Sequence, residues 1–294
     1  MTRENEHRLK KVGPTGDKPD AGTLVYAVIG DPVAHSLSPA MHNAGFAEIG
    51  YNGVFLAFRV TDLPSAIGGI RSLGISGASV TIPHTTAILP LLDEIDERAT
   101  DIGAVNTIVH RNGKLLGFNT DCAGAVAALS GKTEIQGKQV WMIGAGGAAR
   151  AVGYGIVSEG GRLTLLNRTR KKGELLAADL GAEFKPLSEI ERIDCDVLIN
   201  TTSVGMVPDT RAMPVTPQGI ERGMTVMDII YNPLKTRLLR TAEERGCVTV
   251  DGVAMFVHQG AAQFELWTGR EAPVEMMQKV VLKKLESKLS VLTS

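Results

Sequence analysis

The chain has 294 residues, 44% of them hydrophobic, with 33 glycines and a formal net charge of −1. This length accommodates two domains of ordinary size, and the hydrophobic fraction is ample for packed cores. The near-neutral charge argues against nucleic acid or an anionic membrane as a partner. No apolar run reaches about 18 residues, so the sequence predicts no membrane span.

Three cysteines, Cys122, Cys195 and Cys247, are scattered along the chain. They have neither the spacing of a metal site nor the even number of a disulfide framework, so we predict no metal and reduced thiols. Reduced thiols are typical of the cytoplasm, which is the predicted location. Residues 1–22 are polar and charged and lack the apolar stretch of a secretory signal. We expect them to form a disordered tail.

Residues 23–121 predict a first α/β domain. Short β-rich runs at 24–29, 54–58 and 77–82 alternate with helical patterns at about 38–49, 63–73 and 88–102. Ser38 before Pro39 has the order of an N-cap and a first helical position. Asn112-Gly113 lies between β-rich runs at 106–110 and 114–118, and this dipeptide predicts a hairpin.

Residues 122–254 predict a Rossmann-type, doubly wound dinucleotide-binding domain. After a short helix at 123–129, residues 139–200 have the pattern of strand, glycine-rich turn, helix, strand, helix and strand. Apolar runs at 225–229 and 248–250 extend the parallel sheet. Amphipathic helices at 255–267 and 274–292 make up a final segment, 255–294, that we expect to return to the first domain. The site is then expected in the cleft between two α/β domains.

The glycine-rich turn and the end of the next strand indicate the ligand. A turn of this kind lets backbone N–H groups approach a pyrophosphate at a helix N-terminus, and here it comprises Gly144, Ala145, Gly146, Gly147 and Ala148. The following strand ends in Asn167, Arg168 and Thr169. An acidic residue there would bind a ribose 2′-hydroxyl, whereas arginine suits a 2′-phosphate. We therefore expect NADP(H) as cofactor. The alternative is that Arg168 and the basic residues after it, Arg170, Lys171 and Lys172, form only a solvated loop.

Several segments, in order, resemble the shikimate dehydrogenase family from about Leu24 to Leu285. They include Gly30-Asp31-Pro32, Val80-Thr81-Ile82-Pro83, Asn119-Thr120-Asp121 and Tyr231-Asn232-Pro233. Others are residues 103–107, 144–147, 167–169 and 200–206. One glycine motif alone would be weak evidence for the resemblance. This ordered set is strong evidence, because most of its segments lie outside the dinucleotide motif.

The resemblance implies the NADP-linked reduction of 3-dehydroshikimate to shikimate in aromatic amino-acid biosynthesis. It implies that Ser36 and Ser38 bind the substrate carboxylate, and that other residues contact the ring, namely Thr81, Asn106, Asp121, Tyr231 and Gln259. It also implies that Thr202 and Met255 join the glycine turn and the Asn167–Thr169 loop in holding the cofactor. The small-molecule ligands would be bound by a monomer or a homodimer.

Two positions depart from the family pattern. Ser79 stands where the family usually has asparagine, and Thr85 stands where it has a lysine credited with proton transfer. A threonine hydroxyl can donate a hydrogen bond but carries no charge and is a very weak acid. Asp121 is then the predicted acid–base residue, with Thr85 orienting substrate or water. We expect turnover to suffer more than binding. His84, the other proton carrier considered, should point the opposite way from Thr85 on an extended backbone.

Several of these residues also have ordinary structural explanations. Ser38 could cap the following helix, Asp121 could cap the helix after it, Asn106 could brace a turn, and Gln259 could be a buried amide. Two other functions remain open. One is a dehydrogenase acting on quinate or a related polyol acid, and the other is a non-catalytic protein that binds shikimate and NADP.

Overall fold

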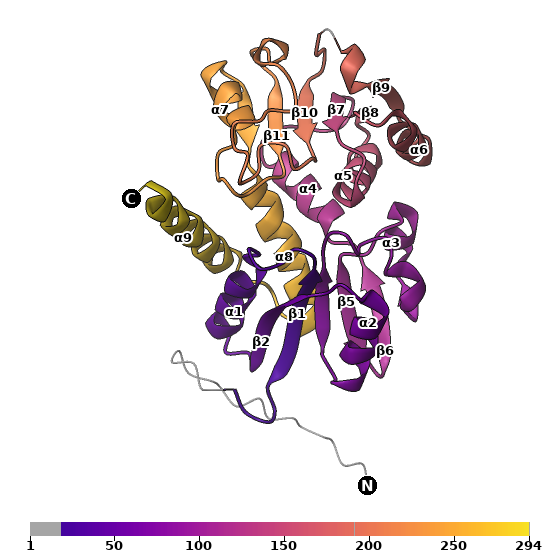
Figure 1. Cartoon of the computed structure of the whole chain (residues 1–294), viewed down its shortest axis with the longest axis vertical. Helices are drawn as coiled ribbons and strands as arrows, with labels where there is room; N and C mark the ends of the chain where they lie inside the picture. Colours follow the sequence, from indigo (N-terminus) through magenta and orange to yellow (C-terminus); the bar gives the residue numbers. More distant parts are fainter. Residues whose placement is uncertain (1–18, 191, 294) are drawn as a thin grey trace.

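The computed structural model describes residues 19–190 and 192–293. It has two α/β lobes, with the amino-terminal lobe below and the lobe that follows it in sequence above (Figure 1). The lower lobe is built from the following elements: β1 (Leu24–Gly30), α1 (Ser38–Glu48), β2 (Gly53–Arg59), α2 (Leu63–Ser72), β3 (Gly77–Val80), η1 (Leu89–Leu91), β4 (Glu94–Ile95), α3 (Glu97–Ile102), β5 (Thr107–Arg111) and β6 (Lys114–Phe118).

The sheet of the lower lobe has the order β2-β1-β3-β5-β6-β4. β1 is parallel to β2 and β3, while β5 runs antiparallel to β3 and β6. The predicted hairpin is confirmed: Asn112 and Gly113, both with positive φ, join β5 to β6. Alternate residues of β1 enter two cores, so Tyr26 and Val28 pack on one face, and Ala27 and Ile29 on the other.

The upper lobe and the C-terminal helices contain the remaining elements: α4 (Asp121–Ser130), β7 (Gln139–Ile143), α5 (Gly147–Ser158), β8 (Arg162–Asn167), α6 (Arg170–Leu180), β9 (Glu183–Pro186), η2 (Leu187–Glu189), β10 (Val197–Asn200), η3 (Pro217–Gly219), β11 (Thr225–Asp228), α7 (Arg237–Glu244), β12 (Val248–Val250), α8 (Gly252–Thr268) and α9 (Val274–Thr293).

The sheet of the upper lobe is wholly parallel, in the order β12-β11-β10-β7-β8-β9. This is the strand order of the doubly wound dinucleotide-binding fold, which confirms the predicted fold class. The order reverses between β7 and β10, and ligands of such sheets bind beyond the carboxyl ends of the strands at this switch point. The glycine-rich turn after β7 lies at that position.

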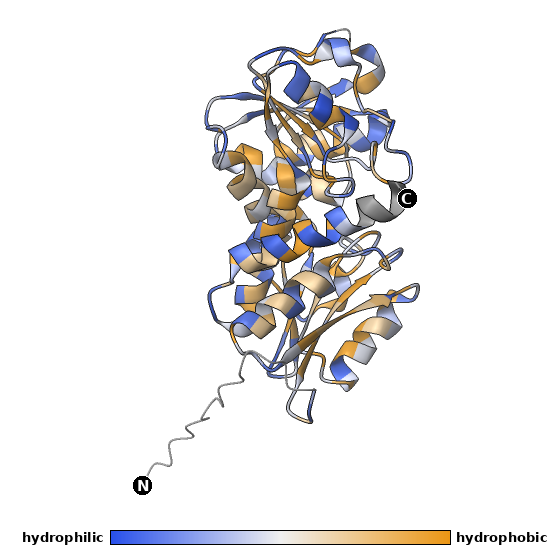
Figure 2. Cartoon of the chain, turned by 90° about the vertical axis from the view of Figure 1, so that its left-hand side faces the viewer, coloured by the Kyte–Doolittle hydropathy of each residue, from blue (hydrophilic) through white to orange (hydrophobic). Residues whose placement is uncertain are grey.

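Helices α4 and α8 connect the lobes. Met255 of α8 packs in the core of the upper lobe, while Val257, Ala261 and Phe264 of the same helix pack in the core of the lower lobe. α9 returns to α1, as expected for the last segment. Apolar residues are concentrated along the strands of both sheets and along α8, with polar residues on the outer helices (Figure 2).

Three predictions at the level of elements were wrong. The expected helix at 88–102 is instead η1, the short strand β4 and α3, because Pro90 interrupts it and the Asp96 side chain caps a new helix by accepting from the Arg98 N–H (3.1 Å). Ser38 is the first helical residue rather than the cap, which is Leu37. The edge strand β9 was missed altogether: it is short, and its last residue, Pro186, is allowed only at a sheet edge.

Most of the predicted tail, residues 1–18, lies outside the described residues. Its last residues are anchored, because Asp20 Oδ1 accepts hydrogen bonds from Gly22 N–H (2.9 Å) and from Asn52 Nδ2 (3.0 Å). Hydrogen-bonded structure among the described residues therefore includes Asp20, before the predicted boundary at Thr23.

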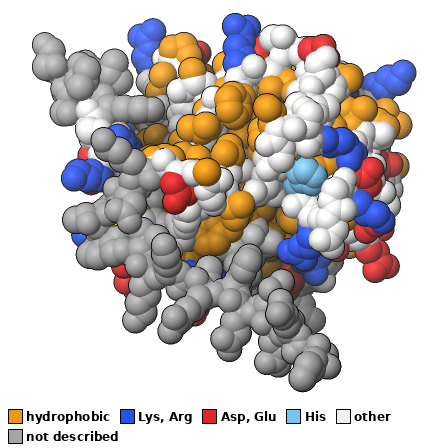
Figure 3. Space-filling model, turned by 90° about the horizontal axis from the view of Figure 1, so that it is seen from below, with side chains coloured by type: hydrophobic (Ala, Val, Ile, Leu, Met, Phe, Trp, Pro, Cys, Tyr) orange, Lys and Arg blue, Asp and Glu red, His pale blue; other side chains and the backbone are white. Residues whose placement is uncertain are grey.

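The far end of the lower lobe carries apolar side chains between charged ones (Figure 3). Among the exposed apolar side chains of this lobe, Leu24, Leu56 and Phe58 lie on the neighbouring strands β1 and β2. Within the described residues, no helix is long and apolar enough to cross a membrane.

Candidate active site between the lobes

A cleft of about 540 Å³ lies between the lobes. Its lower wall comes from the ends of β1 and β3 and the loops that follow them, and its upper wall from the glycine-rich turn and the ends of β10 and β11. α4 and α8 contribute the residues between the walls. The predicted site residues that line it are Ser36, Ser38, Ser79, Thr81, Thr85, Asn106, Asp121, Gly146, Gly147, Ala148, Tyr231, Met255 and Gln259.

The two serines lie where the chain leaves β1 and enters α1. The Ser36 hydroxyl accepts a hydrogen bond from the Ser38 N–H (3.2 Å), which fixes the loop, and Ser38 is buried at the start of the helix. No lysine or arginine lines this cleft, all of whose lining residues are described. A ligand carboxylate in it would therefore be bound by neutral donors such as these hydroxyls.

Asn106 and Asp121 form the polar centre of the cleft. Asn106 Oδ1 accepts hydrogen bonds from the Thr107 hydroxyl and from the Thr120 N–H, both at 2.8 Å, so its NH₂ group is turned toward the start of α4. Burial raises the pKa of Asp121 to about 6, and a hydrogen bond from Asn106 opposes this rise. A carboxyl group with a pKa near neutrality can both accept and return a proton.

Thr85 faces the dinucleotide turn rather than the polar centre. A Cβ atom at Gly147 would lie 2.6 Å from the Thr85 hydroxyl oxygen, so the two lobes are in contact at this point. The neighbouring His84 is buried, and its Nε2–H donates to the Val60 carbonyl (2.8 Å) away from the cleft. His84 therefore has a structural role, as expected from its position on the chain.

The glycine-rich turn has the shape that a pyrophosphate requires. Gly144 has a φ of 122°, which only glycine adopts readily, and the Thr201 hydroxyl lies against the place where its side chain would be. The space beside Gly146 is open, and α5 begins at Gly147, so the first N–H groups of that helix face the cleft. This arrangement fits a dinucleotide phosphate at a helix N-terminus.

The loop after β8 is preformed beside this turn. Asn167 Nδ2 donates to the Thr169 carbonyl (2.8 Å), while Arg168 is exposed and has no ion-pair or hydrogen-bond partner among the described residues. Arg170, by contrast, is paired with Glu174 and Glu189. Arg168 is thus the available cation at the end of β8, and no carboxylate stands there to bind a ribose hydroxyl.

Tyr231, Met255 and Gln259 complete the cleft beside α8. The Tyr231 ring packs on Phe256 with centroids 4.6 Å apart, and burial raises the pKa of its phenol. Gln259 Nε2 donates to the Phe256 carbonyl (2.9 Å), which leaves its oxygen available. Burial also raises the pKa of Asp228 to about 6, but this side chain lies outside the cleft and is held by Thr236, Asn200 and the Ile230 N–H.

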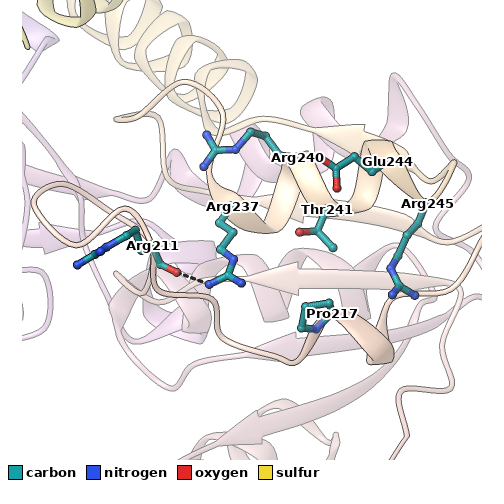
Figure 4. Close-up of a pocket in the computed structure, with 7 residues that line it drawn as sticks. All are labelled: Arg211, Pro217, Arg237, Arg240, Thr241, Glu244 and Arg245. Atoms are coloured by element: carbon teal, nitrogen blue, oxygen red, sulfur yellow. Dashed lines mark hydrogen bonds between the residues drawn. The ribbon is translucent and has the colours of Figure 1, made fainter. Parts of the chain in front are cut away.

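Another concavity, of about 560 Å³, lies on the upper lobe along α7. It is lined by four arginines together with Pro217, Thr241 and Glu244 (Figure 4). Arg237 Nη1 donates to the Arg211 carbonyl (2.8 Å), and Arg245 Nη1 donates to the Ile220 carbonyl (2.9 Å). It has no buried acid–base group and lies toward the sheet edge opposite to Arg168, so it is not the site of the chemistry. Among the described residues, no cluster of His, Cys, Asp and Glu could hold a metal ion.

Some predicted residues lie outside the cleft wall, and some wall residues were missed. Gly144 and Ala145 are in the dinucleotide turn but do not line the cleft, and the Asn167–Thr169 loop lies beside the turn, where the Gly144 N–H donates to the Leu166 carbonyl (2.9 Å). Thr202 shapes its loop by donating to Asn200 Oδ1 (2.7 Å). The wall residue on that loop is instead Thr201. Thr107 and Gln263, which hold Asn106 from below, were also missed: Thr107 ends one of the family segments but was not predicted as a site residue, and Gln263 belongs to none of them.

The lobes and the site define a class: a two-domain α/β dehydrogenase with a dinucleotide turn on one wall and a polar, acid-containing pocket on the other. Three family models match, described as the shikimate dehydrogenase substrate-binding domain (residues 28–108), shikimate/quinate 5-dehydrogenase (126–231) and the shikimate 5′-dehydrogenase C-terminal domain (252–282). The chain belongs to the shikimate dehydrogenase family.

Individual relatives agree with this assignment. An NADP⁺ shikimate dehydrogenase of Methanopyrus kandleri is 47% identical over 282 residues, covering 90% of this chain and 97% of the relative. A shikimate dehydrogenase solved with NADP⁺ is 40% identical, with a TM-score of 0.88 over 93% of this chain and 99% of that one. The Thermus thermophilus enzyme solved with NADP(H) and shikimate is 35% identical, with a TM-score of 0.83, covering 89% and 99%.

Proposed function

We propose that this protein is an oxidoreductase that interconverts 3-dehydroshikimate and shikimate with NADP(H), in the pathway to chorismate and the aromatic amino acids. The observation that carries the proposal is that one cleft joins a hydroxyl- and amide-lined pocket around Asp121 to a preformed dinucleotide turn. The substrate at the Asp121 pocket and the nicotinamide cofactor at the turn would therefore meet in the same cleft, as hydride transfer requires.

The substrate is bound by neutral polar groups. Ser36 and Ser38 donate to its carboxylate from the β1–α1 loop. Its ring hydroxyls face hydrogen-bonding groups from several elements and loops, namely Ser79, Thr81, Asn106, Asp121, Tyr231 and Gln259. Because these side chains are largely buried, an analogue lacking one hydroxyl leaves a polar group unpaired and is disfavoured.

Asp121 is the acid–base residue. In the oxidation direction its carboxylate accepts the proton of the reacting hydroxyl, and in the reduction direction the protonated acid returns it to the carbonyl oxygen. Because burial raises the pKa of Asp121 to about 6, this carboxyl group is mostly ionised at pH 7. Shikimate oxidation, which needs the carboxylate, is therefore favoured above that pKa. No cation stands beside it, since no lysine or arginine lines the cleft.

NADP(H) fits the residues present. The backbone of Gly144–Ala148 would hold the pyrophosphate at the start of α5, and Arg168, with Asn167 and Thr169, would hold the 2′-phosphate. Thr202 stabilises the loop after β10 by donating to Asn200, and Met255, which lines the cleft, would contact the bound cofactor. When bound, the cofactor supplies or accepts the hydride. Thr85, at the contact with Gly147, orients the ligands rather than carrying the proton.

The test is an assay at 340 nm with shikimate and NADP⁺, run with wild-type protein, Arg168→Gln and Asp121→Asn. We expect Arg168→Gln to raise the KM for NADP⁺ by roughly tenfold or more, because a charge-assisted hydrogen bond to phosphate is lost. The KM for NAD⁺ should hardly change. A wild-type protein that prefers NAD⁺, or does not oxidise shikimate, would exclude the proposal.

Quinate is the second candidate substrate. The small Ser79 side chain, whose hydroxyl oxygen accepts from the buried Gln263 amide (3.2 Å), leaves more room at this wall than an asparagine would. Ser38, buried on the other side, limits a larger ring. Comparing kcat/KM for shikimate and for quinate decides between them, and ligand-dependent rises in Tm without any turnover would instead indicate a binding protein.

We also infer the boundaries and the setting of the protein. A substrate-binding unit at 23–121, a nucleotide-binding unit at 122–254 and returning helices at 255–294 agree with the two lobes and with α8. Cys122, Cys195 and Cys247 are free thiols, which is compatible with the cytoplasm. A monomer or homodimer is proposed, and light scattering distinguishes them.

A further inference from the structure

Gln263 lies one turn along α8 from Gln259, but it does not line the cleft. It is fully buried, and its Nε2 atom donates toward three acceptors: Thr107 Oγ1 (3.0 Å), Ser79 Oγ (3.2 Å) and the Asn106 carbonyl (3.2 Å). A carbonyl can only accept, so the nitrogen of the amide, not its oxygen, must face this group. One amide thus holds the neighbouring strands β3 and β5 directly below the cleft.

The direction of the hydrogen bonds continues toward Asp121. The Thr107 hydroxyl accepts from Gln263, so its single proton is directed to Asn106 Oδ1 at 2.8 Å. Oδ1 also accepts from the Thr120 N–H, and one proton of the Asn106 NH₂ group goes to the Thr120 hydroxyl (3.0 Å), so its second proton is left for Asp121. Each donor in this series polarises the next one in a buried, low-dielectric setting.

The series begins in an uncharged core. His42 packs beside Gln263, stacked on Phe55 at 4.5 Å, and burial lowers its pKa to about 3, so the ring is neutral at physiological pH. No hydrogen bond of ordinary geometry joins the two: among the described residues, Gln263 Oε1 and both ring nitrogens lack a partner. The orientation of Gln263 is therefore set from its donor side.

Few charged or titratable groups face Asp121. His35 and Tyr231 share the cleft, and the adjacent Cys122 on α4 is a buried thiol with a raised pKa, near Arg98 of α3. The Asn106 amide is the group that stabilises the ionised carboxylate. We propose that Gln263 is a positioning residue for the acid–base step: through Thr107 it holds the Asn106 amide in the orientation that donates to Asp121.

The proposal rests on the proposed function, because it concerns the same cleft. Its sharpest test is the pair Thr107→Val and Thr107→Ser, which removes or keeps the hydroxyl at a fully buried position. In Thr107→Val, we expect the acidic limb of kcat/KM for shikimate oxidation to move to higher pH by roughly half to one unit, as for one lost hydrogen bond to a charged group. Thr107→Ser should keep the limb of the wild-type protein.

Gln263→Met tests the first link, because it keeps the length of the side chain and removes the donor. As in Thr107→Val, we expect the acidic limb of kcat/KM for shikimate oxidation to move to higher pH. Thr164→Val, a buried threonine on β8 of the other lobe, is the control for the cost of losing a buried hydroxyl, and its limb should stay in place.

A fall in kcat with an unmoved limb in both Thr107→Val and Gln263→Met would assign Gln263 a merely structural role and overturn the proposal. A wild-type protein without shikimate oxidation would instead refute the proposed function, and this is visible before any variant is made.

Discussion

Thr85 is half-buried at the mouth of the cleft, with its hydroxyl against Gly147 and no charge to offer a developing alkoxide. The carboxyl group that remains, Asp121, depends for its ionisation on the neutral amide of Asn106. At the residue scale the site is therefore an acid–base centre supported by hydrogen bonds alone. We therefore predict separately the effect of adding a cation at Thr85 and the effect of removing the carboxyl group of Asp121.

Thr85→Lys is expected to raise kcat for shikimate oxidation by at least about tenfold, since a positioned general acid–base group contributes on the order of 10²–10⁴. An unbranched lysine can extend past Gly147 into the cleft, where its ammonium group also favours ionised Asp121. The 340 nm assay measures the gain. The matched control is Ala87→Lys, at an exposed position two residues further on that does not line the cleft, which should give none. Equal rates in wild type and Thr85→Lys would refute the idea of impaired turnover.

Asp121→Asn is expected to lower kcat by about 10²–10⁴ and, at neutral pH, to stabilise the fold. The folded-state pKa of about 6 lies above the ordinary aspartate value of 3.8, so the native state binds the proton more tightly than the unfolded state does. The wild-type protein therefore loses stability as pH rises from about 4 to 6, by on the order of 1–3 kcal/mol, and stays lower above that range. Urea unfolding should show the variant more stable at pH 8 and little changed at pH 4.

At the scale of elements, the contact between α4 and α8 positions the site. A Cβ atom at Gly124 would lie 2.9 Å from the Gln259 N and 3.0 Å from the Met255 carbonyl, so only glycine lets the helices approach this closely. Asp121 stands at the start of α4, and Met255 and Gln259 stand on α8. The spacing of these functional groups is therefore set by one glycine in the helix crossing.

Gly124→Ala is expected to push the helices apart, lower kcat/KM and destabilise the protein by about 1–3 kcal/mol, the usual cost of overpacking. Gly68→Ala is the control: it lies within α2, and nothing lies within 4 Å of the added methyl group. There the substitution should stabilise by about 0.5–1 kcal/mol through helix propensity. Thermal unfolding and the shikimate assay distinguish the two, and equal effects would show that the crossing tolerates a side chain.

Elements with strong local signals could be predicted from the sequence, whereas those made by tertiary contacts could not. The Asn112-Gly113 hairpin and the strand–glycine turn–helix at 139–158 have local chemistry that favours one structure. β9 is stable only because it pairs with β8 at a sheet edge, and the 88–102 segment bends where Asp96 begins a new helix. In the site, motif residues such as Ser36 and Asp121 could be named, but Gln263 acts through contacts with residues more than 150 positions away.

At the scale of the whole molecule, α8 belongs to both cores, so the lobes should unfold together. Met255 packs in the upper core and Phe264 in the lower one, and breaking either core disrupts the same helix. The chain has two tryptophans, one in each lobe: Trp141 on β7 and Trp267 on α8. These residues provide a separate fluorescence probe for each lobe.

In Trp267→Phe the fluorescence reports on the upper lobe, and in Trp141→Phe it reports on the lower one. We expect the urea midpoint by fluorescence to match the midpoint by far-UV circular dichroism within each variant, as for a two-state transition. Comparing probes within one variant removes the effect of each substitution on stability. Midpoints that differ clearly between the two probes would mean that α8 does not couple the lobes.

The meeting of Thr85 with Gly147 also limits how the two halves can move. Because the Thr85 hydroxyl already lies against Gly147, the two walls cannot come closer at this point unless that side chain moves. The separation of the walls is thus limited here by one side chain, and the cleft of about 540 Å³ is the space that a ring and a nicotinamide would share. The contact between Thr85 and Gly147, as well as the polar residues around Asp121, therefore limits how the substrate and the cofactor can be placed together.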